Sequence, residues 1–377
     1  MKQERDRSFE LQPIRHSALP DVADFLHRWY NGGAKGSPSR LAGEAADSIE
    51  RRLRWLLIEN PVTTPNSPLG YCLRDDLGVM RGLDLCFPVA YLSSEKRILG
   101  LCSGTFFVEP AVRSLGFYLF KKCLSTPGYS FYFASTCNTN SSELWRSIGG
   151  SPIPNSETEY ILPIRLDVVI AAYVAYRTSS QVAARIASTC SRSANPILRF
   201  LTRPSAKLTI APCQDWEKLS ELSRRHRSPD HITSDRSPAL LQWRYGSGSP
   251  SHPCGVYLFR DALGNEGWFS LGHLTRGEGG QFRSSVLLDA IWPRHQMSYR
   301  DLLEEILRVS VGTADALSFR WQPGLDPSEI RRCVFPRKLA TPRAFVRVPK
   351  GAPSFPLASL DYDDSDYIAW AFPWRNE

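Results

Sequence analysis

The sequence predicts an α+β protein in which one unit of strands and helices occurs twice. Its 377 residues exceed the size at which a single hydrophobic core usually stops growing. In each half, strand-like segments dominate and helical segments come late, an order typical of a mostly antiparallel sheet flanked by helices. Landmarks recur at nearly constant separations of 188, 186 and 183 residues, in the pairs Trp55 and Trp243, Asp75 and Asp261, and Pro110 and Pro293. A register this constant predicts an internal duplication.

The elements of the first unit follow from apolar spacing and from the residues that begin and end each segment. Ser48 can cap a second helix, and Pro61 ends it. Asp75 to Gly78 is a turn signal, so its paired aspartates are interpreted as turn residues rather than a catalytic pair. The expected order is strand 9–15, helix 19–30, helix 48–60, strands 69–74, 80–91 and 97–108, helix 113–124, strand 129–136, helix 141–148 and strand 159–164.

A connector joins the two units. Residues 166–201 are helical in pattern and rich in alanine and serine, and their longest apolar run is about half of the ~20 residues that a membrane helix needs. A helix lying on a membrane surface is the less favoured alternative. The expected organisation is a first domain over residues 1–165, a helical connector over 166–204 and a second, degenerate domain over 205–377.

Composition fits a globular protein of the cytoplasm, with 42% apolar and 22% charged residues and no apolar secretory segment at the start. Nine cysteines occur without metal-ligand spacing, so neither a disulfide framework nor a metal site is expected. The net charge of +8 is diffuse, and its short clusters at 51–54 and 224–227 are interpreted as solvated helix faces. Nucleic acid is therefore not an expected partner, whereas the basic surface is compatible with an anionic small ligand.

Residues 361–366 are expected to be a solvated tail whose aromatic end docks on the body.

The segment from Phe106 to Leu119 is the most informative for function. An apolar strand passes through a short loop at Pro110 into a helix. Unpaired N–H groups at the start of a helix and the positive end of its dipole converge there, and such an arrangement binds phosphate. The sequence therefore predicts an anion site that begins at Arg113.

Here the sequence resembles the GNAT acyltransferase superfamily, whose fourth strand ends in V-x-P-x-x-R-G-x-G before the helix that holds the pyrophosphate of coenzyme A. The positions that match this pattern are Val108, Pro110, Arg113 and Gly116. Two positions depart from it, because Ser114 replaces the first loop glycine and Ala111 stands where the family usually has glutamine or arginine. The Cβ of Ser114 narrows the approach to phosphate.

A second segment is similar to the same family. Residues 138–150 look like its N-x-x-S-x-x-L-W-x-x-x-G-G segment, in which an asparagine after the fifth strand contacts the pantetheine arm. In the family the fourth and fifth strands splay apart, and the freed backbone pairs with the pantetheine amides as an added strand would. The resemblance implies cofactor contacts from Phe106, Phe107, Val108, Arg113, Ser114, Leu115, Gly116, Asn138 and Asn140.

The resemblance implies an acyl-CoA-dependent N-acyltransferase that moves an acyl group from a thioester to an amine. The donor is expected to be acetyl-CoA, a longer acyl-CoA or an acylated carrier protein, and no metal is expected. The acceptor is expected to be a small-molecule amine, such as an amino sugar or an amino acid, that sits between the two copies.

The candidates for proton transfer are few. Glu109 is the nearest carboxylate and is a candidate base or, equally, an exposed loop acid. The family's usual leaving-group tyrosine is replaced by Trp145, so Tyr132 or Tyr118 would have to supply a hydroxyl. Positioning and oxyanion stabilisation can support such transfers without strong acids and bases.

The second copy lacks the glycine of the first. Pro293 is followed by residues 294–299 without any glycine, which disfavours close approach of the backbone to a pyrophosphate. We expect this copy to bind no coenzyme A and to shape the acceptor pocket or brace the first copy. His295 is interpreted as a surface residue rather than a base reaching across the interface. Two other functions stay open: an aminoacyl-tRNA-dependent transferase resembling the tandem-GNAT ligases of cell-wall assembly, and a non-catalytic scaffold or sensor with the same fold.

Overall fold

The computed structural model describes residues 8–31, 46–93, 96–196, 208–249, 254–276, 282–320, 335–338, 341–351 and 360. The proposed aromatic tail lies outside these residues, as does the end of the connector. The elements of the first half are β1 (Phe9–Pro13), a 3-10 turn (His16–Ala18), α1 (Leu19–Asn31), α2 (Ala46–Leu57), β2 (Gly70–Asp75), β3 (Met80–Ser93), β4 (Lys96–Val108), a 3-10 turn η2 (Pro110–Leu115), α3 (Gly116–Cys123), β5 (Phe131–Ala134), α4 (Thr139–Ser147), β6 (Ser151–Pro152) and β7 (Thr158–Pro163).

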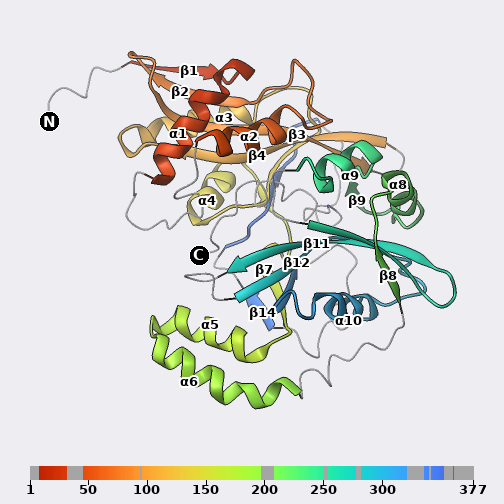
Figure 1. Ribbon diagram of the computed structural model, residues 1–377. Coiled ribbons are helices and arrows are strands. Elements are labelled where there is room, and N and C mark those ends of the chain that lie inside the picture. Colours follow the sequence, from red (N-terminus) through yellow and green to blue (C-terminus); the bar gives the residue numbers. More distant parts are fainter. Residues whose placement is uncertain are drawn as a thin grey trace.

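After a helical hairpin, the second half repeats most of this order, with a strand, two helices, three strands, a helix and a further strand, and with β9 inserted between the two helices (Figure 1). The hairpin consists of α5 (Leu166–Thr178), α6 (Gln181–Ser191) and a short 3-10 turn η3 (Arg192–Ala194). The elements of the second half are β8 (Thr209–Pro212), α8 (Trp216–Arg225), β9 (Ile232–Ser234), α9 (Pro238–Tyr245), β10 (Cys254–Arg260), β11 (Glu266–Arg276), β12 (Phe282–Ile291), α10 (Tyr299–Ser310), β13 (Ala316–Arg320), β14 (Phe335–Lys338) and β15 (Phe345–Arg347).

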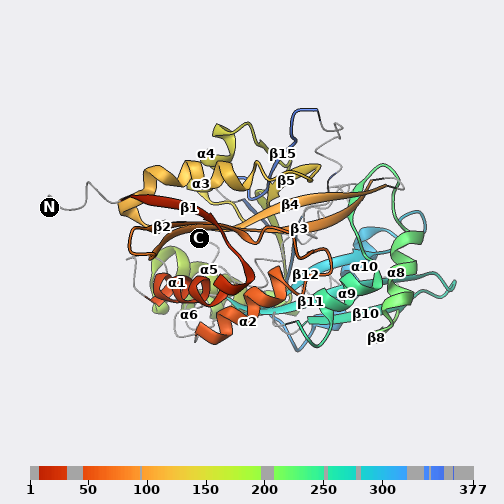
Figure 2. The same cartoon turned by 90° about the horizontal axis from the view of Figure 1, so that it is seen from above.

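Each half is built around one twisted sheet with helices on both faces. The first sheet has the strand order β1-β2-β3-β4-β5-β15-β6, and β9 pairs with β3 beside it. Helices α1 and α2 cover one face of this sheet, and α3 and α4 cover the other (Figure 2). The second sheet has the order β14-β7-β13-β12-β11-β10-β8. It is packed against α8 and α9 on one face and against α10 on the other.

Both sheets are mostly antiparallel, and among the described strands each contains one parallel pair, β4 with β5 in the first sheet and β12 with β13 in the second. In both copies the first strand of the parallel pair carries a bulge, with Gly104 as the extra residue of β4 and Leu288 as the extra residue of β12. The register shifts between Leu85 and Cys86 in the first copy and between Ser270 and Leu271 in the second. The expected α+β class and the internal duplication are confirmed.

The two halves exchange one strand each. Strand β7 belongs to the first half in sequence, but it lies in the second sheet between β13 and β14. Strand β15 comes from the C-terminal part of the chain and lies in the first sheet between β5 and β6. We expected residues 159–164 to close the first sheet, and this was wrong because the pattern of a short strand specifies its faces but not its neighbours. The sheets therefore do not divide the chain at residue 165, and the proposed boundaries of 1–165, 166–204 and 205–377 stay a prediction for the folding units.

The repeat-related tryptophans meet at the junction of the halves. The rings of Trp55 and Trp243 stack with their centroids 4.7 Å apart and their planes 21° apart. Each indole N–H donates to the main-chain carbonyl oxygen of the other residue at 3.0 Å. Such a reciprocal contact is the mark of a two-fold axis, here between two copies within one chain.

Candidate functional site

An open strand edge is the first feature of the candidate site. Strand β5 pairs with β4 only from Gly100 to Cys102, whereas β4 continues to Val108. From Ser103 onward β4 stays paired with β3 on its other side. Among the described residues, no backbone hydrogen bond closes the edge of β4 that faces away from β3 between Ser103 and Val108. An edge of this kind can accept an extended ligand as an added strand.

The side chains of this segment face two different layers. Phe106 lies against Phe120 of α3, with ring centroids 5.7 Å apart, and Phe107 lies against Trp29 of α1 at 5.3 Å. Gly116 is buried, and a Cβ at this position would lie 3.2 Å from Phe106 and 3.3 Å from Val108. The glycine therefore allows α3 to pack closely on β4, whereas the motif had suggested a close approach to phosphate.

The loop after β4 is tighter than an extended phosphate-binding loop. Residues Pro110–Leu115 form a 3-10 turn, in which the N–H of Val112 donates to the carbonyl oxygen of Glu109 at 3.0 Å. The N–H of Gly116 donates to the carbonyl oxygen of Arg113. The expected run of free amides from Arg113 onward is thus partly used within the turn. Arg113 and Ser114 are exposed at the start of α3, and no side chain caps that helix.

Two of the three candidate proton-transfer residues already have partners, and the third, Tyr118, is 65% exposed. Glu109 forms an ion pair with Arg81 at 3.1 Å, and Arg81 also binds Asp75 at 2.9 Å. The hydroxyl of Tyr132 donates to the carbonyl oxygen of Thr126 at 2.6 Å. Burial raises the pKa of the Tyr132 phenol, against a lowering effect from the positive charge of Arg347. A role of Tyr132 as a proton donor requires this hydrogen bond to break.

The second sequence motif forms the start of α4. The side-chain oxygen of Asn138 accepts from the N–H of Ser141 at 3.0 Å, and the Ser141 hydroxyl accepts from the N–H of Asn138 at 2.8 Å. This reciprocal cap explains the Asn and Ser of the motif by helix formation. Asn140 is exposed in the first turn, and Trp145 is buried against Phe120.

One buried carboxyl group beside the open edge was missed by the sequence analysis. Asp84 of β3 is fully buried. Its Oδ1 accepts a hydrogen bond of 3.0 Å from the hydroxyl of Ser103, which is the first residue of the unpaired edge. Among the described residues, none forms a hydrogen bond with its Oδ2. Burial raises the pKa of Asp84 to about 7, although Cys123 and Ser103 partly offset this effect. A lone acid within an otherwise apolar strand was the signal that could have identified it.

The raised pKa predicts that Asp84 makes stability depend on pH. The unfolded carboxyl ionises near pH 3.8 and the folded one near 7, so unfolding releases a proton between these values and stability falls as pH rises. We expect a slope of up to ~1.4 kcal/mol per pH unit in this window, measured by urea unfolding at a series of pH values.

Asp84→Asn should remove this slope and keep the hydrogen bond from the Ser103 hydroxyl. Asp76→Asn, at an exposed turn position, controls for the loss of one carboxylate. Parallel pH profiles for wild type and Asp84→Asn would show that Asp84 is ionised in the folded protein.

The equivalent helix start in the second copy is closed. The Ser298 hydroxyl accepts from the N–H of Asp301 at 3.1 Å and caps α10, and it also donates to the Asp301 carboxylate at 2.7 Å. β12 and β13 pair only from Ser284 to Val286, so β12 is also unpaired toward its end. In both copies, therefore, the two strands of the parallel pair separate after three paired residues. The copies differ in the helix that follows, because α10 has a side-chain cap and α3 has none. His295 is exposed, in agreement with its interpretation as a surface residue.

A basic hollow lies at the end of β12, between α8 and β9. Its basic lining residues are Arg227, Arg236, Arg294, His226 and His231. Burial lowers the pKa of His231, and the positive charge of Arg294 lowers it further. Arg227 was interpreted as part of a solvated helix face. This was wrong, because α8 ends at Arg225 and Arg227 is half-buried in the lining of the hollow. β9 pairs with β3 at Tyr91 to Ser93, the end of β3 away from the open edge, so the hollow and that edge are separate places.

Two further observations limit the chemistry. Among the residues that the structure describes, no group of three or more histidine, cysteine, aspartate or glutamate side chains could hold a metal ion. None of the described helices combines the length and the apolar character that a bilayer crossing requires.

Comparisons with known proteins identify the architecture. No protein-family model matches the sequence. No curated protein matches it either. A GCN5-related N-acetyltransferase of Anabaena variabilis aligns over 90% of this chain and 73% of its own, with a TM-score of 0.55 at 11% identity. An Enterococcus faecalis protein described as a "Probable N-Acyltransferase" aligns over 91% and 72%, with a TM-score of 0.54 at 9% identity.

A third similar structure is itself a ligand complex. The N-myristoyltransferase of Saccharomyces cerevisiae with bound myristoyl-CoA aligns over 94% of this chain and 84% of its own, with a TM-score of 0.53 at 12% identity. At such identities the likeness concerns the fold alone. On this ground the chain has the GNAT fold, present as two halves in tandem.

Proposed function

We propose that the protein is an acyl-CoA-dependent N-acyltransferase whose donor binds in the first half. One combination of features carries the proposal: an unpaired edge of β4 from Ser103 to Val108 leads directly to the uncapped start of α3. The second half has the splay without the open helix start, because Ser298 caps α10. The first half is therefore the better place for a ligand that is extended at one end and anionic at the other.

The chemistry of an acyl thioester carrier fits this combination. The two amides of a pantetheine arm can pair with the β4 edge, and the diphosphate can lie at the positive end of α3 near Arg113. Myristoyl-CoA is bound by the structurally similar yeast enzyme, which supports a donor of this class. An acylated carrier protein presents the same arm. The remaining cofactor candidates, Ser114, Leu115 and Asn140, lie on the surface or partly buried around this path.

The acceptor is proposed to be a small-molecule amine held between the two copies. Glu109 would take the amine proton only after release from Arg81. Because Trp145 is buried and Tyr132 is bonded to Thr126, catalysis in this proposal depends chiefly on placing the amine against the thioester.

The proposal is tested by calorimetric titration with acetyl-CoA and longer acyl-CoAs. Arg113→Glu should weaken binding about tenfold, because it puts a negative charge beside the diphosphate. Lys121→Glu is the matched control, since it makes the same charge change at an exposed position later in α3 and should leave affinity within about twofold. Equal weakening by both variants, or no binding of any acyl-CoA or acylated carrier, contradicts the proposal.

A non-catalytic binding protein is the second candidate. It is favoured by the commitment of Tyr132, Asn138 and Trp145 to hydrogen bonds or packing within the protein. Donor binding without transfer to a panel of amines would select it over the enzyme.

A further inference from the structure

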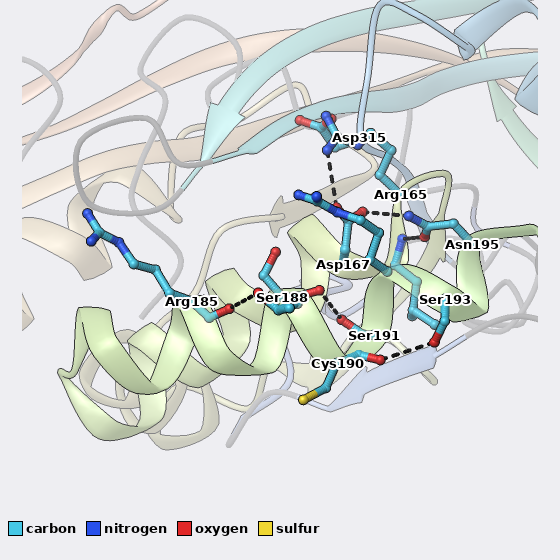
Figure 3. Close-up of polar contacts among 12 residues, drawn as sticks. Arg165, Asp167, Arg185, Ser188, Cys190, Ser191, Ser193, Asn195 and Asp315 are labelled. Atoms are coloured by element: carbon cyan, nitrogen blue, oxygen red, sulfur yellow. Dashed lines mark hydrogen bonds and ion pairs between the residues drawn. The ribbon is translucent and has the colours of Figure 1, made fainter.

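The hairpin of α5 and α6 lies at the edge of the molecule beside the second sheet (Figure 1). A polar cluster fixes its base. The Asp167 carboxylate accepts from Asn195 at 2.8 Å and pairs with Arg165 at 3.2 Å, and Arg165 also lies 3.8 Å from Asp315 (Figure 3). This cluster anchors the hairpin to the body. Beyond it most described residues of α5 are half-buried, whereas many residues of α6 are exposed.

The hairpin carries large apolar side chains on its surface. Tyr173 is 60% exposed, Val182 69% and Ile186 61%, and these are three of the eight most exposed large apolar residues in the described part of the chain. Val182, Ile186 and Cys190 follow each other at intervals of four residues, so they form one stripe along α6. Tyr173 belongs to α5, on the other side of the turn at Ser179.

The exposed charges of the hairpin are all positive. Asp167 is the sole acidic residue between positions 166 and 196, and it is buried in the basal cluster. Arg177 and Arg185 are exposed. Arg192 lies 3.8 Å from Asp167 in the basal cluster, and its side chain is 73% exposed. Figure 3 shows Arg185 pointing away from the basal cluster. The surface therefore combines apolar side chains with basic ones and exposes no acid.

We propose that this hairpin docks on an anionic lipid surface. Acidic headgroups attract the arginines, and the interfacial region accepts the valine, isoleucine and tyrosine side chains, so one partner satisfies both features. A second copy of the chain suits the surface less well, because pairing two hairpins places the arginines of one against those of the other with no acid between them. The proposal is independent of the proposed donor site, which belongs to β4 and α3 of the first sheet.

Vesicle co-sedimentation of the full chain tests the proposal. Binding is expected to vesicles of phosphatidylglycerol and phosphatidylcholine at roughly 0.05 M salt, to be lost at roughly 0.5 M salt, and to be absent from pure phosphatidylcholine. The variant with both Val182→Asp and Ile186→Asp should lose affinity about tenfold or more, and Arg185→Glu should lose about tenfold. Leu263→Asp is the matched control, since this residue is 87% exposed in the turn between β10 and β11 and should leave binding unchanged. All four positions are exposed, and circular dichroism checks that each variant is folded.

A probe in the stripe gives a second readout. Cys190 is exposed, so a polarity-sensitive fluorophore on its thiol should report transfer to a less polar environment on anionic vesicles. Cys190→Ser controls for labelling of other thiols. Equal lipid binding by wild type and the double aspartate variant overturns the proposal. A doubled mass in solution that the double variant abolishes also overturns it, because the surface then serves self-association.

Discussion

Replacing Trp55 with alanine is expected to lower the free energy of unfolding by about 3–5 kcal/mol. The side chain is 3% exposed and loses its stack with Trp243 and its hydrogen bond. The carbonyl of Trp243 also loses the hydrogen bond from the Trp55 indole, and this loss adds to the cost of the cavity. Urea unfolding measures the change.

A double-mutant cycle distinguishes the pair from two separate core residues. Trp55→Ala and Trp243→Ala should together cost at least 1 kcal/mol less than the sum of the single changes, because the first replacement already removes the shared contact. Trp216→Ala, at a partly buried tryptophan of the second half, should cost less than Trp55→Ala. Additive single effects would mean that the stack does not couple the copies.

Arg236→Met is expected to destabilise the protein by about 3–5 kcal/mol. Arg236 is 8% exposed and holds the fully buried Asp289 through two hydrogen bonds of 2.9 and 3.0 Å. Removing the guanidinium takes both of these hydrogen bonds away from a buried carboxylate. The pair also joins the segment after β9, which is bonded to the first sheet, to β12 of the second sheet.

An exposed ion pair provides the control for this prediction. Arg225 and Glu221 lie 2.6 Å apart on α8 with both side chains more than half exposed, so Arg225→Met should change stability by about 0.5 kcal/mol or less. Combining Arg236→Met with Asp289→Leu should restore much of the lost stability, since neither charge then remains buried. A loss as small for Arg236→Met as for Arg225→Met contradicts the prediction.

The sequence was sufficient for the duplication and the element order, because both depend on local periodicity and on turn residues. The equivalence of Trp55 and Trp243 was visible as a constant separation, but their contact was not, since a repeat says nothing about where its two-fold axis lies. The exchange of β7 and β15 could not be predicted for a related reason. A short strand of alternating pattern can pair with either sheet until all neighbours are known.

The candidate site shows the limit of reading motifs. Gly116 matches a phosphate-loop position, yet its missing Cβ admits Phe106 and Val108. Asn138 matches a pantetheine-contacting position, and its oxygen caps α4. One residue type satisfies both a structural and a binding demand, so residue identity alone does not separate them. Asp84 was missed because its importance comes from burial, and the sequence indicates this burial only through one acidic residue in a mostly apolar strand.

The strand exchange has a consequence for synthesis on the ribosome. The neighbour that β5 needs on its outer side is residues 345–347, which are translated more than two hundred residues after β5 itself. Until that stretch emerges, the nascent first sheet exposes an unpaired edge to other chains, a condition that favours intermolecular pairing. Residues 345–347 therefore complete a sheet whose other strands are mostly translated much earlier. Until then, we expect a chaperone that holds nascent chains to bind at β5.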